Sequence, residues 1–113
     1  MIQIYHNSRC SKSREGLQIL EESGIDFQIM DYMKEKLSVQ ELKELVEKLG
    51  INPIELVRKN ETIWKENFKG KEISDAKILE AMAEFPSLIE RPIVVNNGKA
   101  VVGRPPILIK DIL

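Results

Sequence analysis

The chain has 113 residues, of which 42% are hydrophobic and 31% are charged. That length suits one domain with one modest core, and the ordinary apolar content argues against intrinsic disorder. Lys and Arg total 17 and Asp and Glu total 18, so the net charge of -1 gives no bulk attraction to nucleic acids or acidic membranes. The longest apolar runs, such as residues 93–95, are too short to span a bilayer, and we expect no signal peptide.

The only cysteine is Cys10, so the chain cannot form an internal disulfide. Free thiols persist in reducing compartments. We therefore expect a cytoplasmic protein, and we expect it to be a monomer.

The first part of the chain predicts a strand, a helix and a second strand. Apolar and polar residues alternate over residues 2–5, as in a short strand, and a polar loop follows. Residues 11–23 have the helical spacing of apolar and small residues, and Gly24 is a natural stop. Residues 27–29 alternate again, and this order predicts a right-handed parallel unit. Cys10 lies between the first strand and the start of the helix.

The middle of the chain predicts helices only. Ser38 and Glu41 form a capping box for a helix that Gly50 ends, and Pro53 begins a shorter helix. Apolar residues recur at helical spacing between these boundaries. Residues 61–73 predict a further short helix and a loop.

The last part of the chain predicts a helix, a hairpin and a final turn. Ser74 can cap the helix, which Pro86 limits. A β-hairpin follows, with strands at residues 92–95 and 100–102 and an Asn-Gly turn that suits positive φ. Residues 107–113 predict one or two helical turns. The order of elements predicts an α/β fold with a small mixed sheet flanked by helices.

Cys10 is the strongest candidate for chemistry. A free thiol has a pKa of about 8.5, which falls at helix N-termini and beside cations. Both conditions are expected here, because a helix follows Cys10 and the basic residues His6, Arg9, Lys12 and Arg14 are close to it in the chain. The alternative is an inert cysteine in the core, but the basic and polar neighbours favour a reactive thiolate.

The sequence leaves more than one possible role for two residues near Cys10, Ser13 and His6. Ser13 stands in a C-x-x-S motif where a C-x-x-C oxidoreductase has its resolving thiol, so an adduct on Cys10 needs an external thiol. Its hydroxyl could donate a hydrogen bond to the thiolate, or Ser13 could be an ordinary first-turn residue. His6, the only histidine, could stabilise the thiolate as a cation, relay a proton, or have no role. One His and one Cys are too few for a closed zinc site, and we expect no metal.

Arg58, Arg91 and Arg104 each lie at the end of an expected element. An arginine side chain presents a planar fork of donors that suits tetrahedral oxyanions. If the three converge on a thiolate, they form an oxyanion site with an attached nucleophile. Spacing along the chain alone favours the alternative, that they are ordinary surface arginines.

These residues give the sequence a resemblance to a known family. Residues 5–14 resemble the active-site loop of the glutaredoxin-coupled arsenate reductase (ArsC) family. Three further blocks resemble that family in the same order along the chain: residues 56–60, 89–95 and 103–105. Together the four blocks extend over nearly the whole chain, and they are far more specific than the cysteine motif alone.

The resemblance implies a fold for the single ArsC-like domain. A thioredoxin-like core would consist of residues 1–33 and 86–113, and a helical insertion would occupy residues 34–85. The resemblance also implies that Pro92 is the cis-proline that borders the active site, in a bond type that is cis in about 5–6% of cases.

The resemblance also implies roles. Cys10 would be the nucleophile that attacks arsenate, and His6 would help to keep it ionised. The oxyanion would bind to Arg58, Arg91 and Arg104, and the supporting residues would be Asn7, Ser13, Arg14 and Pro92. Glutathione, as co-substrate, would attack the cysteinyl–arsenic adduct, and glutaredoxin would take up the mixed disulfide while arsenite leaves. No bound cofactor is implied.

The active-site loop departs from the usual arsenate reductase pattern. Ser8 stands in place of a proline, and Ser11-Lys12 stands in place of Gly-Thr. The Cys-Ser-Lys-Ser-Arg form resembles a YfgD-like subfamily. One alternative is an Spx-like regulator that binds RNA polymerase, but those proteins usually carry C-x-x-C and lack the full arginine set. Another is a monothiol glutaredoxin-like protein that acts on glutathione mixed disulfides.

Overall fold

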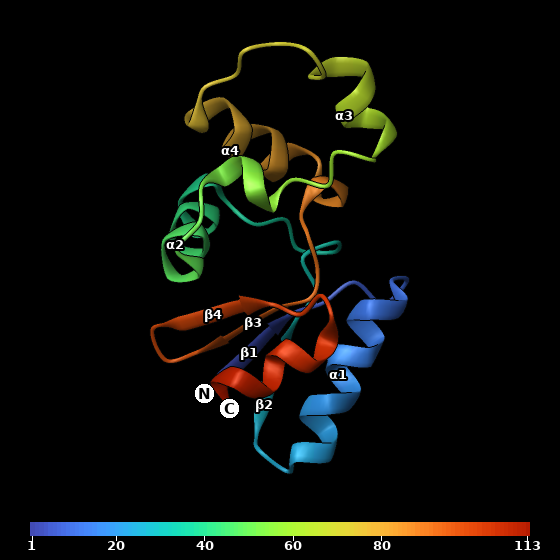
Figure 1. Cartoon of the computed structure of the whole chain (residues 1–113), viewed down its shortest axis with the longest axis vertical. Helices are drawn as coiled ribbons and strands as arrows, with labels where there is room; N and C mark the ends of the chain where they lie inside the picture. The colour runs from blue at the N-terminus through green and yellow to red at the C-terminus, as the bar shows by residue number, and fades with distance from the viewer. The chain divides into compact units, whose positions relative to one another are not determined.

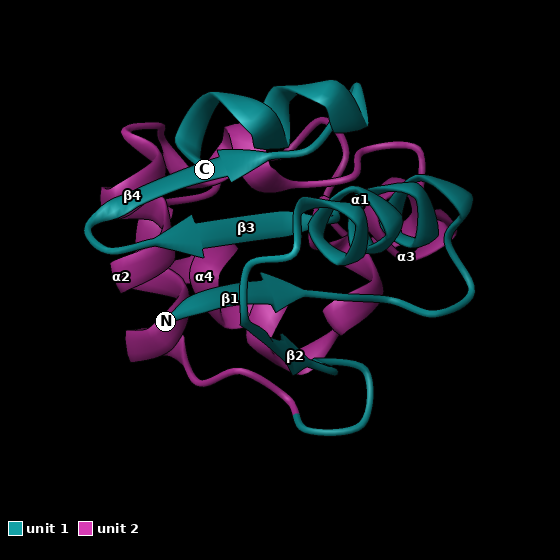
Figure 2. Cartoon of the chain, turned by 90° about the horizontal axis from the view of Figure 1, so that it is seen from below, with its two compact units in different colours: residues 1–35, 91–113 teal, residues 36–90 magenta.

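The computed structural model describes all 113 residues (Figure 1). The chain forms two compact units, one of Met1–Glu35 with Arg91–Leu113 and one of Lys36–Glu90 (Figure 2). Residues 86–90, which the resemblance assigns to the core, therefore lie in the second unit, and residues 34–35 lie in the first.

The first unit is built on a four-stranded mixed sheet of order β2-β1-β3-β4. Strand β1 (Ile2–Tyr5) is parallel to β2 (Phe27–Met30) and antiparallel to β3 (Ile93–Asn96), and β4 (Lys99–Val102) completes the hairpin with β3. The predicted parallel unit, the hairpin and the pairing of β1 with β3 are all confirmed. At the hairpin turn Asn97 has a φ of 52°, as the Asn-Gly step predicts.

One face of this sheet carries helix α1 (Ser11–Ser23) and the 3-10 helix η3 (Pro106–Ile112), which pack against each other (Figure 1). Their shared core with the strands consists of Ile2, Ile4, Leu20, Val94 and Ile109. Helix α1 ends at Gly24, whose φ of 73° is the left-handed conformation that a glycine adopts without cost. The predicted final turns are thus present, as a 3-10 helix.

The second unit contains all the helices that the sequence predicts for the middle of the chain, and it also has one isolated antiparallel bridge between Val57 and Ile89. Its elements are α2 (Val39–Leu49), η1 (Pro53–Leu56), α3 (Thr62–Asn67), α4 (Asp75–Glu84) and η2 (Pro86–Leu88). The predicted capping box is present: the Ser38 hydroxyl accepts the Glu41 N–H at 3.1 Å, and the Glu41 carboxylate accepts the Ser38 N–H at 3.3 Å. None of the helices in either unit has the length and apolar character that crossing a membrane requires.

We predict that Leu20→Ala lowers the free energy of unfolding by about 2–5 kcal/mol, because Leu20 is fully buried in the core of the first unit and alanine leaves a cavity. Gln18→Ala, on the exposed side of the same helix, is the control and should change it by no more than about 0.5 kcal/mol. Urea unfolding of the full chain measures both. Equal effects of the two substitutions would contradict this packing.

Candidate active site

The backbone places Cys10 at the N-cap of α1, with φ -95° and ψ 124°. Its N–H donates to the Asn7 carbonyl at 3.0 Å, and its own carbonyl accepts the Arg14 N–H at 3.0 Å. The Asn7 side chain accepts the Arg9 N–H at 3.0 Å, and the Arg14 guanidinium donates to the Ser8 carbonyl at 2.9 Å. The predicted position of Cys10 at the helix N-terminus is confirmed, and Asn7 and Arg14 shape the loop that leads to it.

The surroundings of Cys10 favour its thiolate. Partial burial raises the pKa of the Cys10 thiol, but hydrogen bonds from the Ser13 N–H, the Arg91 side chain and the Lys12 N–H, with the positive charge of Arg91, lower it more. The net pKa of Cys10 therefore lies below its ordinary value. Two of these donors are free N–H groups of the first helical turn, which is where a helix can accommodate negative charge.

Two of the three predicted arginines meet at Cys10. Arg91, which precedes β3, is buried and hydrogen-bonds the sulfur. Arg104, which follows β4, places Nη1 4.0 Å from the Cys10 sulfur and donates to the Arg91 carbonyl at 3.2 Å. These guanidinium groups reach the thiol from residues that flank the hairpin, although they are far from Cys10 in the chain.

The third arginine, Arg58, lies in the second unit. Its N–H donates to the Leu88 carbonyl at 2.7 Å, and its guanidinium lies 3.5 Å from the Glu61 carboxylate and 3.9 Å from that of Glu90. Arg58 is therefore held by two acidic side chains, which the sequence did not single out. Its part in binding an oxyanion stays a prediction.

His6 acts on Ser13 rather than directly on the sulfur. Its Nδ1 lies 2.6 Å from the Ser13 hydroxyl, which also accepts the Asn7 N–H at 3.0 Å. Burial lowers the pKa of His6, and the Arg14 charge adds to this, outweighing the Asp31 carboxylate and the Ser13 hydrogen bond, which raise it. The neutral imidazole is thus favoured near pH 7, in place of the cation considered above. Ser13 contributes its N–H to the thiol, while its hydroxyl is engaged by His6 and Asn7.

Pro92 directly follows Arg91, and the Arg91–Pro92 bond is cis, as the resemblance implies. The Arg104–Pro105 bond is also cis, which neither the sequence nor the resemblance predicts. No group of three or more His, Cys, Asp or Glu side chains is placed to hold a metal ion.

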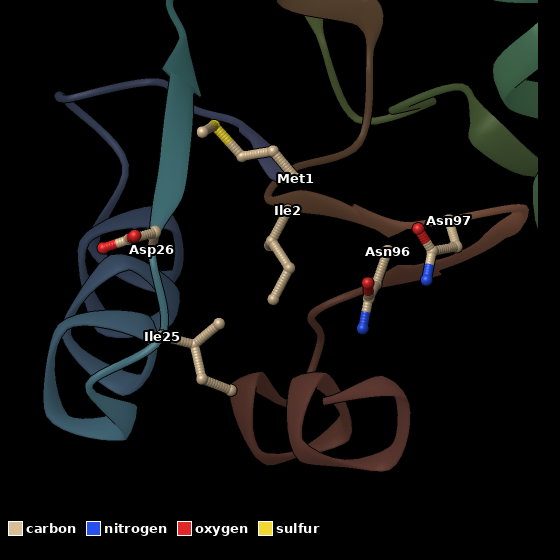
Figure 3. A pocket seen from close by; sticks show the side chains of 6 residues that line it. All are labelled: Met1, Ile2, Ile25, Asp26, Asn96 and Asn97. Carbon is tan, nitrogen blue, oxygen red and sulfur yellow. The ribbon is translucent and has the colours of Figure 1, made fainter.

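A pocket of about 500 Å³ lies elsewhere in the first unit (Figure 3). It includes Ile2 at the start of β1, whereas Cys10 follows the end of that strand. Its lining residues are Met1, Ile2, Ile25, Asp26, Asn96 and Asn97. It contains no thiol and no cationic side chain, and the Asn96 amide already donates to the Ile112 carbonyl at 2.6 Å. The Cys10 group is therefore the site with reactive chemistry.

We predict that Ser13→Ala leaves the pKa of Cys10 below about 8.5, because alanine retains the N–H that bonds the sulfur. The measurement is the midpoint pH of Cys10 alkylation, with Cys10→Ser as the unreactive blank. A midpoint that rises to the free-thiol value would show that the retained N–H does not support the thiolate without the hydroxyl, which bonds His6 and accepts the Asn7 N–H.

We also predict that the free energy of unfolding decreases as the pH falls below about 6.5, because the folded chain holds His6 neutral. The sign follows from proton uptake: with the folded pKa lowered from 6.5, the unfolded chain binds more protons in this range. His6→Gln should weaken the pH dependence below about pH 6.5, where the unfolded histidine begins to take up its proton. Both proteins are compared by urea unfolding in a Cys10→Ser background, which eliminates titration of the thiol. An unchanged slope in His6→Gln would contradict the lowered pKa.

Comparison with known proteins connects this site to a family. The sequence model of the ArsC family matches residues 5–112. An arsenate reductase of Haemophilus influenzae is 43% identical over 112 residues, which cover 97% of each chain. The Escherichia coli protein YfgD is 42% identical over 114 residues, with 99% of this chain and 96% of YfgD covered.

Solved structures agree. An arsenate reductase from Vibrio cholerae superposes with a TM-score of 0.94 at 48% identity, covering 99% of this chain and 97% of that one. The predicted α/β, thioredoxin-like architecture is thereby confirmed. Because the family model matches residues 5–112, which are almost the whole chain, the chain belongs to the ArsC family.

Proposed function

We propose that this protein reduces arsenate to arsenite, with Cys10 as the nucleophile. The observation that carries the proposal is the donor set at its sulfur: the N–H groups of Lys12 and Ser13 and the guanidinium groups of Arg91 and Arg104. Relatives that share more than two-fifths of the sequence are named arsenate reductases, which supports the same reaction for this chain.

The first step forms a sulfur–arsenic bond. The Cys10 thiolate attacks arsenic(V), and one arsenate oxygen takes up protons and leaves as water. Because thiolate and arsenate are both negative, their approach requires positive charge at the site. Donors fixed in advance around the developing charge lower the barrier without having to reorganise during the reaction. Arg91 and Arg104 supply this charge, and the role of Arg58 as a third ligand of the oxyanion stays a prediction from the family resemblance.

The reduction itself needs external thiols. Ser13 stands where a C-x-x-C protein has its resolving cysteine, so this chain has no second thiol to close a disulfide with Cys10. In the proposed cycle the glutathione thiol attacks the arsenic of the adduct, and an arsenic-bound oxygen leaves as water. The glutaredoxin thiolate then attacks the glutathione sulfur and breaks its bond to arsenic, so the two external thiols become one mixed disulfide and arsenic(V) gains two electrons. Water hydrolyses the remaining bond between Cys10 and arsenic(III), which releases arsenite and regenerates the Cys10 thiol.

The proposed cycle uses glutathione as a co-substrate and involves no bound cofactor. Because Cys10 must be reduced to begin each turnover, we place the reaction in the reducing cytoplasm. The group of His6, Ser13 and Asn7 has a structural part in it, because it fixes the loop and the first helical turn that bring the N–H donors to the sulfur.

The test is steady-state arsenate reduction with glutathione, glutaredoxin, glutathione reductase and NADPH. We expect NADPH consumption that requires arsenate, both thiols and Cys10. Consumption that proceeds without arsenate, on a glutathione mixed disulfide, would instead assign a monothiol glutaredoxin-like activity. If the purified chain reduces neither substrate, the proposal is wrong and its site serves another anion or a protein partner.

We predict that Arg91→Lys and Arg104→Lys each lower kcat by about 10²–10³-fold, because lysine keeps the charge and loses the planar fork. Arg9→Lys, an exposed arginine next to Cys10 in the chain, is the matched control and should remain near wild type. Cys10→Ser should abolish turnover, since a hydroxyl is a far weaker nucleophile at neutral pH. Wild-type kcat in both Arg91→Lys and Arg104→Lys would exclude their role in binding the oxyanion.

A further inference from the structure

Gly16 lies in the interior of α1, where alanine is the better helix former. Its backbone does not have a positive φ, so the conformation itself does not call for glycine. Glycine is required here because space is short: a methyl group at this position would be 2.8 Å from Pro92 Cγ and 2.9 Å from Ile109 Cδ1. Gly16 is therefore a glycine because Pro92 packs directly on the helix backbone.

Gly103, at the end of the hairpin, makes the corresponding contact with Pro92. It follows β4, is buried, and would place a methyl group 3.0 Å from both Pro92 Cγ and Ile109 Cδ1. Its N–H donates to the Pro92 carbonyl at 2.8 Å. The fully buried Pro92 ring is thus packed against two glycines that are remote from each other in the chain.

The two contacts bear directly on the arginines at Cys10. Arg91 precedes Pro92 and Arg104 follows Gly103, and the Arg104 guanidinium donates to the Arg91 carbonyl at 3.2 Å. The short segments 91–92 and 103–104 therefore lie against each other through two hydrogen bonds. A displacement of Pro92 would move the backbone from which both guanidinium groups reach the sulfur.

We propose that Gly16 and Gly103 are positioning residues for the thiolate: their lack of a side chain lets Pro92 pack where Arg91 can bond Cys10. The inference deepens the proposed function, since it concerns the same nucleophile. Both glycines act at a distance through Pro92 and touch no reacting atom. The groups that face Cys10 itself are the two arginines and the N–H groups of Lys12 and Ser13.

The test is the midpoint pH of Cys10 alkylation in Gly16→Ala and Gly103→Ala, which needs no arsenate. We expect the midpoint to rise toward the free-thiol value of about 8.5 in both variants. Each unit of rise leaves about tenfold less thiolate at a pH below both midpoints. Gly98→Ala is the matched control, because that glycine has open space around its missing side chain and no positive φ, and its midpoint should equal that of the wild type. Circular dichroism verifies that each variant is folded.

Two further variants, used as backgrounds for Gly16→Ala, show which contact transmits its effect to Cys10. In Arg91→Lys the midpoint should already be raised, and adding Gly16→Ala should raise it little further if the glycine acts through Arg91; additive shifts would overturn the proposal. Ile109→Val removes Cδ1 and hence the other close contact of the new methyl group. The shift caused by Gly16→Ala should persist there, whereas its disappearance would assign the effect to η3 instead of Pro92.

These variants also keep the test decisive if an alanine alone prevents folding. Gly16→Ala and Gly103→Ala are then measured in the Ile109→Val background, which removes the Cδ1 contact of both new methyl groups and leaves Gly103→Ala the contact with Cγ1 at 3.1 Å. Unchanged midpoints in folded variants of both glycines would overturn the proposal. A lowered wild-type midpoint without any arsenate turnover would remove the proposed function and leave the positioning role of the glycines standing.

Discussion

The negative charge on a partly buried sulfur is the constraint on which the rest of the site depends. Burial alone favours the neutral thiol and raises the pKa of Cys10. The thiolate is stable only because the start of α1 supplies N–H donors and Arg91 supplies a charged one. These donors stabilise the thiolate only if they lie next to the Cys10 sulfur. The fold therefore has to bring residues from both ends of the chain together around that sulfur.

The mixed sheet brings these donors together at the Cys10 sulfur. Strand β1 leads into the loop that ends at Cys10, and antiparallel pairing with β1 fixes β3, which Arg91 and Pro92 precede. The hairpin returns the chain through β4 to Gly103 and Arg104. On the covered face, Leu20 of α1 and Ile109 of η3 pack on the same strands, so the helix that carries Cys10 is fixed to the sheet that carries the arginines.

The sequence predicted most of this fold because its signals are local. The capping box at Ser38, the stop at Gly24 and the Asn-Gly turn each depend on residues close in the chain, and each is present in the structure. Periodicity could not distinguish a 3-10 helix from an α-helix at residues 106–112, because both give short apolar repeats.

The site was less accessible from the sequence. Spacing placed Cys10 at a helix N-terminus, but the meeting of Arg91 and Arg104 at its sulfur comes from strand pairing between distant segments, which no local pattern encodes. The neutral state of His6 depends on burial, which a lone histidine in a polar loop does not reveal. The sequence shows a glycine within the predicted helix, but the close approach of Pro92 that requires it there is seen only in the structure.

Titration of the Cys10 sulfur measures whether the fold holds it as a thiolate. Since Cys10 is the only cysteine, the ultraviolet absorbance of the thiolate against pH reports on it alone, with Cys10→Ser as the blank. We expect a single titration with a midpoint below about 8.5 in the wild type. A midpoint at or above that value would contradict this expectation, because the helix N-terminus and the two arginines would then not stabilise the charge.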